Sequence, residues 1–263
     1  MPLRVPRWTS PPRTPQESPL TVWRLCLDVL PKTPDAALRP WITPAERERA
    51  RRYRATADRH RHLAGRALAR LLLARRLRCP PPAVAFTEGP HGKPHLEAPA
   101  PGGPSLHFNI AHTGTTVVVA VSQDEPVGVD VEPLGRDVDT DALAGRILTA
   151  AEQAQWRALP AAERPAALLH LWTCKEAFVK ATGEGLGRGA HTVACDLDGG
   201  PASALSDAEG HVPASPRTAA EAWALCPFAL PNNLVGAVVR RGALPHPVAW
   251  RTAAPLVRRP WQA

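Results

Sequence analysis

The same local pattern occurs twice in this chain of 263 residues: an apolar residue, Thr, two further residues and Glu, at Ile42–Glu46 and again at Leu148–Glu152. In each copy the Thr suits the N-cap position of a helix, and the Glu three residues later completes a capping box. A long helical pattern and then strand-like runs follow each copy, so the order helix, long helix, sheet is repeated. The repetition predicts a pseudo-duplicated α+β protein of two similar lobes.

Periodicity places the long helices and the strands that follow them. The first helix is expected to continue from Pro44 to Arg78, through a stretch that contains twelve arginines. The second is expected over Ala166–Thr182, and strand-like runs cover Leu106–Ser122 and Ala222–Arg240. The apolar stripe of the first helix consists of Ala64, Ala67, Leu68, Leu71 and Leu72.

Composition divides the chain into four parts. Residues 1–20 and 243–263 are rich in Pro and Arg, which predicts poorly ordered tails. The folded part between them is expected to form an N-terminal lobe over residues 21–124 and a C-terminal lobe over residues 125–242.

The net charge limits the kinds of partner that the chain can bind, and the cysteine content limits the cellular compartments in which it is expected. The formal charge is +8 and the sequence pI is about 9.9, which predicts a polyanionic partner: nucleic acid, a phosphorylated small molecule or an acidic protein. The five cysteines are scattered and never form a CxxC pair, so neither a disulfide framework nor a zinc site is indicated. No apolar stretch approaches the length needed to span a bilayer, and we expect a cytoplasmic protein.

The segment Pro126–Glu132 has the alternation of a β-strand, which places Asp130 and Glu132 on one face. Two carboxylates in this arrangement repel each other unless solvent or a cation separates them, and a hard divalent cation with oxygen ligands is a natural remedy. A solvated outer face of an antiparallel strand is the alternative for an isolated pair of this kind.

Three further segments carry polar groups that suit phosphate chemistry. On the second long helix, Glu176 and Lys180 are i and i+4 neighbours among aromatic and apolar residues; a surface salt bridge is the alternative. His112 precedes a turn of small residues, where an imidazole can reach a phosphate or be a satisfied structural group. Gly92-Lys93-Pro94 is a turn that presents a lysine, or an ordinary loop.

Taken together, in the order in which they occur along the chain, the four segments resemble the Sfp-type 4′-phosphopantetheinyl transferase family. The marks of that family are a GKP turn, an FN-I-[SA]-H-[ST] segment, a GIDIE-like strand and a W-x-x-KE-x-x-x-K helix. This chain supplies Gly92–Pro94, Phe108–Thr113, Gly128–Glu132 and Trp172–Lys180, and the arginine-rich helix is also similar. The resemblance extends from about residue 40 to about residue 190.

The resemblance implies a pseudo-twofold α+β fold, with a long helix packed on a small antiparallel sheet in each lobe and coenzyme A bound in the cleft between the lobes. It implies that Asp130, Glu132 and Glu176 hold Mg²⁺, or Mn²⁺, which bridges to the diphosphate, and that Lys180 neutralises a phosphate oxygen. The residues that match positions contacting the nucleotide end, including its 3′-phosphate, are Arg49, Arg61, His62, Lys93, Pro94 and His112. Ala111 stands where many members carry Ser, and Glu46 stands where some carry a basic residue.

The implied reaction transfers the 4′-phosphopantetheine arm of coenzyme A to a serine hydroxyl of an apo acyl or peptidyl carrier protein and releases adenosine 3′,5′-bisphosphate. Glu176 and Lys180 are the expected catalytic residues, with Glu176 or a water on the metal as the base. We expect a monomer that acts on coenzyme A and a carrier domain, without nucleic acid or a membrane. The sequence leaves open which carrier is served, in fatty acid, polyketide or nonribosomal peptide synthesis.

Two alternatives remain at this stage. A nucleic-acid-binding protein would use the twelve arginines between Arg47 and Arg78, but it gives the carboxylates no task. Another Mg²⁺-dependent phosphoryl or diphosphate enzyme would share the metal site but does not predict the ordered set of motifs.

Overall fold

The computed structural model describes residues 18–31, 34–97, 105–183, 193–195, 203–204, 206–207, 223–245 and 248–253. The described chain divides into two compact units. The N-terminal unit contains the described residues up to 125 together with residues 248–253, and the C-terminal unit contains those from 126 to 245.

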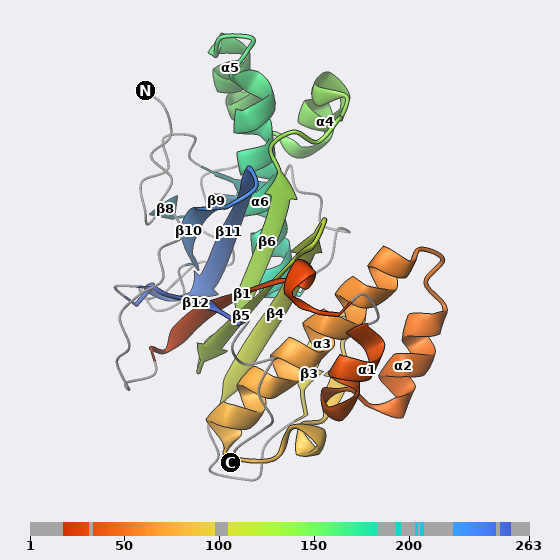
Figure 1. The fold of residues 1–263 in the computed structure, drawn as a ribbon. Helices are drawn as coiled ribbons and strands as arrows, with labels where there is room; N and C mark the ends of the chain where they lie inside the picture. Colours follow the sequence, from red (N-terminus) through yellow and green to blue (C-terminus); the bar gives the residue numbers. More distant parts are fainter. Residues whose placement is uncertain are drawn as a thin grey trace. The chain divides into compact units, whose positions relative to one another are not determined.

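The N-terminal unit is built on a four-stranded sheet with the order β12-β1-β5-β4. Strand β1 (Leu20–Cys26) pairs antiparallel with β5 (Thr116–Gln123), which pairs antiparallel with β4 (Leu106–Thr113). The predicted strand-like run is therefore a hairpin, whose turn contains Gly114 at a φ of 52°. Helix α3 (Thr56–Leu77) packs on β4 and β5, as Figure 1 shows.

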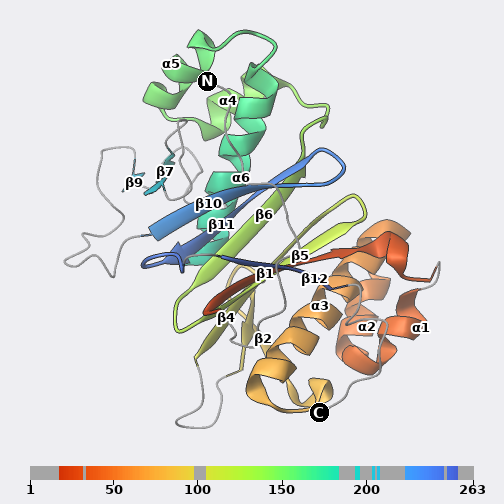
Figure 2. The same ribbon diagram turned by 60° about the vertical axis from the view of Figure 1, so that its left-hand side comes forward.

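The other edge of this sheet comes from the far end of the chain. Strand β12 (Ala249–Thr252) pairs parallel with β1, so that Thr21 lies opposite Ala249 and Arg24 opposite Thr252. This strand lies within residues 243–263, where composition suggested only a tail. Figure 2 shows β12 beside β1.

The long helical pattern of the N-terminal unit forms two helices. The predicted capping box is confirmed: the Thr43 hydroxyl accepts from the backbone of Glu46, whose carboxylate accepts from Thr43 N–H, and α2 (Pro44–Arg51) begins there. The prediction of one continuous helix to Arg78 is wrong, because α2 ends at Arg51 and α3 begins at Thr56. Closely spaced arginines on either side of the break repel one another along a helix, which favours an interruption there.

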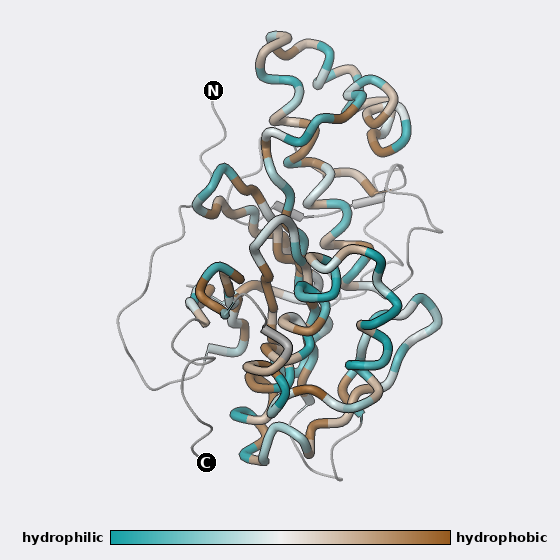
Figure 3. The backbone as a smooth tube through the Cα atoms, turned by 45° about the vertical axis from the view of Figure 1, so that its right-hand side comes forward, coloured by the Kyte–Doolittle hydropathy of each residue, from teal (hydrophilic) through white to brown (hydrophobic). Residues whose placement is uncertain are grey.

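The predicted apolar stripe of α3 is buried against the sheet, and Ala64, Ala67 and Leu68 are fully enclosed. The tube in Figure 3 shows the mixture of hydrophilic and hydrophobic residues along these elements. The remaining elements of this unit are α1 (Pro34–Leu38), the 3-10 turns Leu27–Val29, Arg39–Trp41 and Pro81–Ala83, and the hairpin of β2 (Phe86–Glu88) and β3 (Pro94–Leu96).

The C-terminal unit is built on an antiparallel sheet with the order β6-β11-β10-β8. Its strands are β6 (Val127–Pro133), β11 (Leu234–Arg241), β10 (Trp223–Leu230) and β8 (Ser203–Ala204). The second predicted strand-like run, Ala222–Arg240, forms the hairpin of β10 and β11, although residue 222 lies outside the described residues. Leu230 pairs with Leu234, and in the three-residue turn between them Asn232 and Asn233 adopt positive φ values of 66° and 57°, which Asn tolerates better than most residues.

Three helices complete the C-terminal unit: α4 (Thr140–Ile147), α5 (Ala150–Ala158) and α6 (Arg164–Thr182). The second capping box is confirmed at Thr149 and Glu152, and α6 ends where Gly183 adopts a φ of 76°. Helix α6 packs on β6 and β11. The predicted α+β class is thus confirmed, with a long helix packed on a small, mainly antiparallel sheet in each unit. A further pair, β7 (Val193–Ala194) and β9 (Ser206–Asp207), lies outside these sheets.

Across the ranges that the structure describes, no helix combines the length and the apolar character needed to traverse a bilayer.

Candidate functional site

A close approach between α6 and β6 positions the predicted carboxylates of the C-terminal unit. A Cβ atom on Gly128 would lie 2.0 Å from the carbonyl oxygen of Ala177 and 2.4 Å from the backbone nitrogen of Ala181. Only glycine therefore allows the two backbones to come this near. The contact brings the helix that carries Glu176 and Lys180 onto the strand that carries Asp130.

Asp130 and Lys180 meet directly across this contact. The Lys180 ammonium donates to Asp130 Oδ1 at 2.6 Å, and the Asp130 side chain is only 8% exposed. The other oxygen, Asp130 Oδ2, and Glu176 Oε1 are both buried and have no hydrogen-bond partner among the described residues. Two buried carboxylate oxygens without donors are costly unless a further ligand satisfies them.

Glu132, the third carboxylate, is held by groups from two other segments. Its Oε1 accepts from Arg136 Nη1 at 2.8 Å and from Trp172 Nε1 at 3.3 Å. Burial raises the pKa of Glu132, and the charge of Asp130 raises it further. Burial also raises the pKa of Glu176, where Lys180 opposes the effect and Asp130 and Glu132 add to it.

The chemistry of this group suits a hard divalent cation, because all its ligands are oxygens and two of those oxygens are unsatisfied. Among the residues that the structure describes, however, no three His, Cys, Asp or Glu side chains are gathered closely enough to hold a metal ion together. The structure therefore brings the four predicted residues Asp130, Glu132, Glu176 and Lys180 into one neighbourhood without fixing a coordination geometry.

A second, fully buried ion pair supports the helix beneath this site. Lys175 is 0% exposed and donates to Glu152 Oε2 at 2.6 Å and to the Ile147 carbonyl at 2.7 Å. Glu152 also accepts from the backbone N–H groups of Thr149 and Cys195, each at 2.7 Å. Its carboxylate thus connects α5, α6 and the segment that contains β7. Lys175 is the residue before Glu176, so this ion pair fixes the part of α6 that carries Glu176.

The N-terminal unit gathers a second group of predicted residues. Arg49 on α2 donates to Glu88 Oε1 on β2, and Arg66 on α3 donates to the same oxygen at 2.9 Å. His62, one turn before Arg66, contacts the Tyr53 hydroxyl through Nδ1 at 3.3 Å. Burial lowers the pKa of His62 to about 4, and the charges of Arg66, Arg49 and His112 also act to lower it.

The remaining predicted residues of this unit lie at two turns. Arg61 donates to the Gly114 carbonyl at 2.9 Å and pairs with Asp58, so it fixes the β4–β5 turn that follows the exposed His112. Lys93 precedes β3, and burial lowers its pKa to about 8. In the β2–β3 hairpin, Pro94 lies directly opposite Glu88, which places the Gly-Lys-Pro turn next to the Arg49 ion pair.

Glu46, the position that departs from the family pattern, has a structural role here. Arg70 donates to both of its carboxylate oxygens, at 2.7 and 2.9 Å, and Arg70 is 2% exposed. The same Arg70 also donates to the carbonyl groups of Trp41 and Val84. Glu46 therefore holds α2 against α3, which explains why an acidic residue stands at this position.

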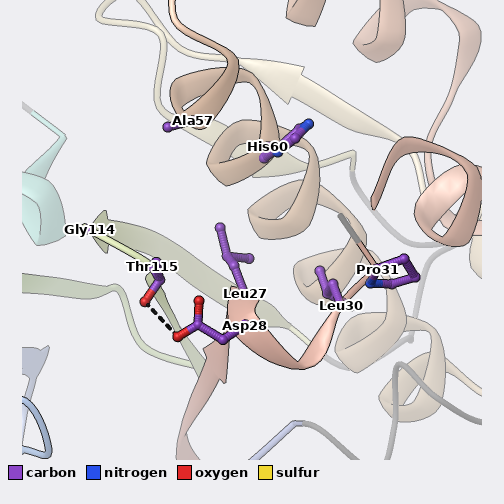
Figure 4. Close-up of a pocket in the computed structure, with 8 residues that line it drawn as sticks. All are labelled: Leu27, Asp28, Leu30, Pro31, Ala57, His60, Gly114 and Thr115. Atoms are coloured by element: carbon purple, nitrogen blue, oxygen red, sulfur yellow. Dashed lines mark hydrogen bonds between the residues drawn. The ribbon is translucent and has the colours of Figure 1, made fainter. Parts of the chain in front are cut away.

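A pocket of about 370 Å³ opens elsewhere in the N-terminal unit, and Figure 4 shows its lining. Asp28 lies at one side, where its Oδ2 accepts from the Thr115 hydroxyl at 3.3 Å, and His60 lies on the opposite helix. A carboxylate and apolar side chains suit a phosphate poorly, and none of the predicted residues lines this pocket. The lining consists of Leu27, Asp28, Leu30, Pro31, Ala57, His60, Gly114 and Thr115.

The lowered pKa of His62 predicts an acid-sensitive fold. The pKa is 6.5 in the unfolded chain and about 4 in the folded one, so the unfolded chain binds more protons between these values and stability falls as the pH drops from about 6.5 towards 4. We expect His62→Gln to reduce the stability lost between pH 7 and pH 5 by about 1–2 kcal/mol. Urea unfolding at both pH values, in buffers without phosphate, measures this. Because burial also lowers the pKa of His95 and His170, an equal loss in both proteins would assign the acid sensitivity to those residues instead.

Comparisons with known proteins agree with this arrangement of motifs. Residues 126–234 match the profile described as the 4′-phosphopantetheinyl transferase superfamily, and residues 34–124 match the profile of the N-terminal part of 4′-phosphopantetheinyl transferase. The chain is 32% identical over 230 residues to the 4′-phosphopantetheinyl transferase HetI of Nostoc sp., a match that covers 87% of this chain and 90% of HetI. The chain belongs to the 4′-phosphopantetheinyl transferase superfamily. The predicted resemblance to the Sfp type is thereby confirmed.

Two further phosphopantetheinyl transferases match over shorter stretches. The putative 4′-phosphopantetheinyl transferase slr0495 of Synechocystis sp. is 36% identical over 155 residues, or 59% of this chain. The 4′-phosphopantetheinyl transferase psf-1 of Bacillus pumilus is 36% identical over 152 residues, or 58% of this chain. Each of these matches covers 62% of the relative, so the chain spans less than two thirds of the length of both.

Several residues that position the carboxylates of the C-terminal unit and the Arg49–His62 group of the N-terminal unit were not predicted from the sequence. Arg66 and Glu88 lie far apart in the sequence and meet only when α3 packs beside the β2–β3 hairpin. The roles of Arg136 and Trp172 as donors to Glu132 were also missed. For Arg136 a signal was present, because it stands four residues after Glu132.

Proposed function

We propose that the chain transfers the 4′-phosphopantetheine arm of coenzyme A to a serine hydroxyl of an apo acyl or peptidyl carrier protein, with release of adenosine 3′,5′-bisphosphate. The observation that carries this proposal is the group of Asp130, Glu132, Glu176 and Lys180, because motifs far apart in the sequence meet there with buried, unsatisfied carboxylate oxygens. Membership of the superfamily supports the same reaction.

The direct test is the intact mass of an apo carrier after incubation with the chain, coenzyme A and Mg²⁺. We expect the mass to rise by one phosphopantetheine group, and the rise to disappear when the carrier serine is replaced by Ala. An unchanged mass with carriers of fatty acid, polyketide and nonribosomal peptide synthesis would contradict the proposal.

Asp130, Glu132 and Glu176 are the residues that would hold Mg²⁺ or Mn²⁺ in this proposal. When bound, the ion would neutralise charge on the diphosphate of coenzyme A. Lys180 lies 2.6 Å from Asp130, so its ammonium is available beside the carboxylates to neutralise a phosphate oxygen as negative charge moves to the leaving group. The raised pKa of Glu176 suits a group that accepts the proton of the serine hydroxyl.

We further propose that the nucleotide end of coenzyme A, including its 3′-phosphate, is bound by the N-terminal unit. Arg49 supplies charge there, and His62 supplies a hydrogen-bonding nitrogen: its Nε2 is buried without a partner among the described residues, and its low pKa keeps it neutral at pH 7. The other proposed contacts are Arg61, Lys93, Pro94 and His112.

Removal of the metal or of one ligand should stop transfer. A chelator is expected to abolish activity, and added Mg²⁺ or Mn²⁺ to restore it. Asp130→Ala should reduce the rate of transfer by about 100-fold or more. The Asp130 carboxylate contacts Lys180 through one oxygen, and its other oxygen has no hydrogen-bond partner among the described residues and can bind a cation. Asp141→Ala, at an exposed acid of α4 in the same unit, is the control. Full activity of Asp130→Ala in the presence of chelator would show that this site is wrongly assigned.

The nucleic-acid alternative receives little support from the arginine-rich helix. Arg70 is buried, and its guanidinium group is taken up by the Glu46 carboxylate and by the carbonyl groups of Trp41 and Val84. We infer a monomer that acts in the cytoplasm without nucleic acid or a membrane, which the scattered cysteines favour.

A further inference from the structure

Glu88 is the shared partner of two arginines in the N-terminal unit. Arg49 and Arg66 both donate to the same oxygen, Glu88 Oε1. The Arg66 side chain is 8% exposed, whereas those of Arg49 and Glu88 are 45% and 40% exposed. The two guanidinium groups thus converge on one point that solvent can reach.

The nearby acid Glu46 also attracts Arg66, but it forms its ion pair with a third arginine, Arg70. Both of its oxygens are taken up by Arg70, and one also accepts from Thr43 N–H. Within the described part of the unit, the guanidinium groups of Arg49, Arg66 and Arg70 thus face two carboxylates, those of Glu46 and Glu88, and positive charge is in excess. Such a site keeps an attraction for a further anion.

The surroundings of Glu88 add groups that bind phosphate. Pro94 lies opposite Glu88 in the hairpin, so Lys93 is close by along the chain. His62 stands four residues before Arg66 on α3, so its imidazole lies on the same side of that helix. A phosphate monoester brings about 1.5–2 negative charges and three acceptor oxygens to such a place, more than a carboxylate can offer.

We propose that Glu88 acts as an internal counter-ion, which holds Arg49 and Arg66 until the 3′-phosphate of coenzyme A displaces it, and that Arg66 is an additional residue binding this phosphate. The inference rests on the proposed function, since coenzyme A carries its one phosphate monoester at the 3′ position. Displacing Glu88 therefore offsets part of the affinity that the 3′-phosphate provides, whereas 3′-dephospho-coenzyme A has no group for this place and leaves both pairs with Glu88 intact.

The test is calorimetry at low ionic strength with coenzyme A and with 3′-dephospho-coenzyme A. Glu88→Gln is expected to bind coenzyme A about 5-fold more tightly, while the affinity for the dephospho form changes less than twofold. The matched control is Glu48→Gln, which removes an equal charge from an exposed pair with Arg51 on α2. A loss of coenzyme A affinity in Glu88→Gln, or an equal gain in Glu48→Gln, would overturn the inference.

A second pair of variants tests the role of Arg66. In the Glu88→Gln background, Arg66→Gln is expected to lower the affinity for coenzyme A by about 10-fold or more, as the loss of a charged contact to phosphate does, and to leave the dephospho form unchanged. An equal loss for both ligands would exclude Arg66 from the 3′-phosphate contact. Should Glu88→Gln fail to fold, Glu88→Asp retains the charge but shortens the reach, and it must still bind coenzyme A more tightly than the natural chain does.

The outcomes separate this inference from the proposed function. If the natural chain modifies a carrier and prefers coenzyme A to its dephospho form, but Glu88→Gln shows no gain, only the inference fails. If the natural chain neither binds coenzyme A nor modifies a carrier, the proposed function fails, and this inference fails with it.

Discussion

Glu176→Gln is expected to reduce the rate of phosphopantetheine transfer by about 100-fold or more, while the affinity for coenzyme A changes less than about threefold. Gln keeps the shape of Glu and a carbonyl oxygen that can still face a cation. It loses the negative charge and the basic oxygen that accepts the serine proton, and both matter more in the transition state than in the bound complex.

The surroundings of Glu176 make this separation measurable. Lys180 donates to Asp130 at 2.6 Å, and the substitution leaves that ion pair in place. Burial raises the pKa of Glu176, and removing its charge also relieves repulsion with Asp130 and Glu132, so Glu176→Gln should fold at least as well as the natural chain.

Steady-state kinetics with saturating carrier, together with calorimetry for coenzyme A, separates the two effects. The conservative control is Glu163→Gln, an exposed acid that precedes the same helix. Normal turnover in Glu176→Gln would remove Glu176 from the transfer step. A complete loss of coenzyme A binding would make it a structural ligand.

Glu152→Ala is expected to lower the free energy of unfolding by about 3–5 kcal/mol, because it leaves the ammonium of Lys175 buried without its counter-charge. The backbone N–H groups of Thr149 and Cys195 lose their acceptor in the same substitution. For a chain of this size the midpoint of thermal unfolding should fall by roughly 10 °C.

A double substitution distinguishes the buried charge from the lost packing. In Glu152→Ala with Lys175→Met, no charge is left unpaired, so the double variant should be more stable than Glu152→Ala alone. Urea unfolding of the natural chain, both single variants and the double variant gives the coupling between the two residues. If the two single substitutions lowered the free energy of unfolding by amounts that add up to the effect of the double substitution, the ion pair would contribute no coupling energy.

The parts of the fold that depend on neighbours in sequence were predictable. Both capping boxes, the apolar stripe of α3 and the strand β6 arise from local spacing, and each is found where it was expected. The break between α2 and α3 was not predicted, because the hydrophobic period continues across it. The repulsion between the arginines depends on which acidic side chains lie near each of them in the folded protein.

The parts of the site that depend on distant segments were not predictable in the same way. The motifs named Asp130, Glu176 and Lys180, but the reason why Gly128 precedes Asp130 appears only when α6 lies against β6. Glu88 gave no signal at all, since its partners Arg49 and Arg66 are separated from it by more than twenty residues. Likewise, nothing in the composition of residues 249–252 distinguishes a strand from a tail.

The pairing of β1 with β12 has a consequence for the order in which the protein can assemble. The ribosome produces Leu20–Cys26 more than 200 residues before Ala249–Thr252, so the intervening elements of both units must be made before β1 gains its second neighbour. Until then, one edge of the nascent sheet exposes unpaired N–H and C=O groups, which are open to pairing with another chain. Shortened forms that end after β11 would keep this open edge permanently, and expression yields of such fragments should suffer from aggregation even if every catalytic group is present.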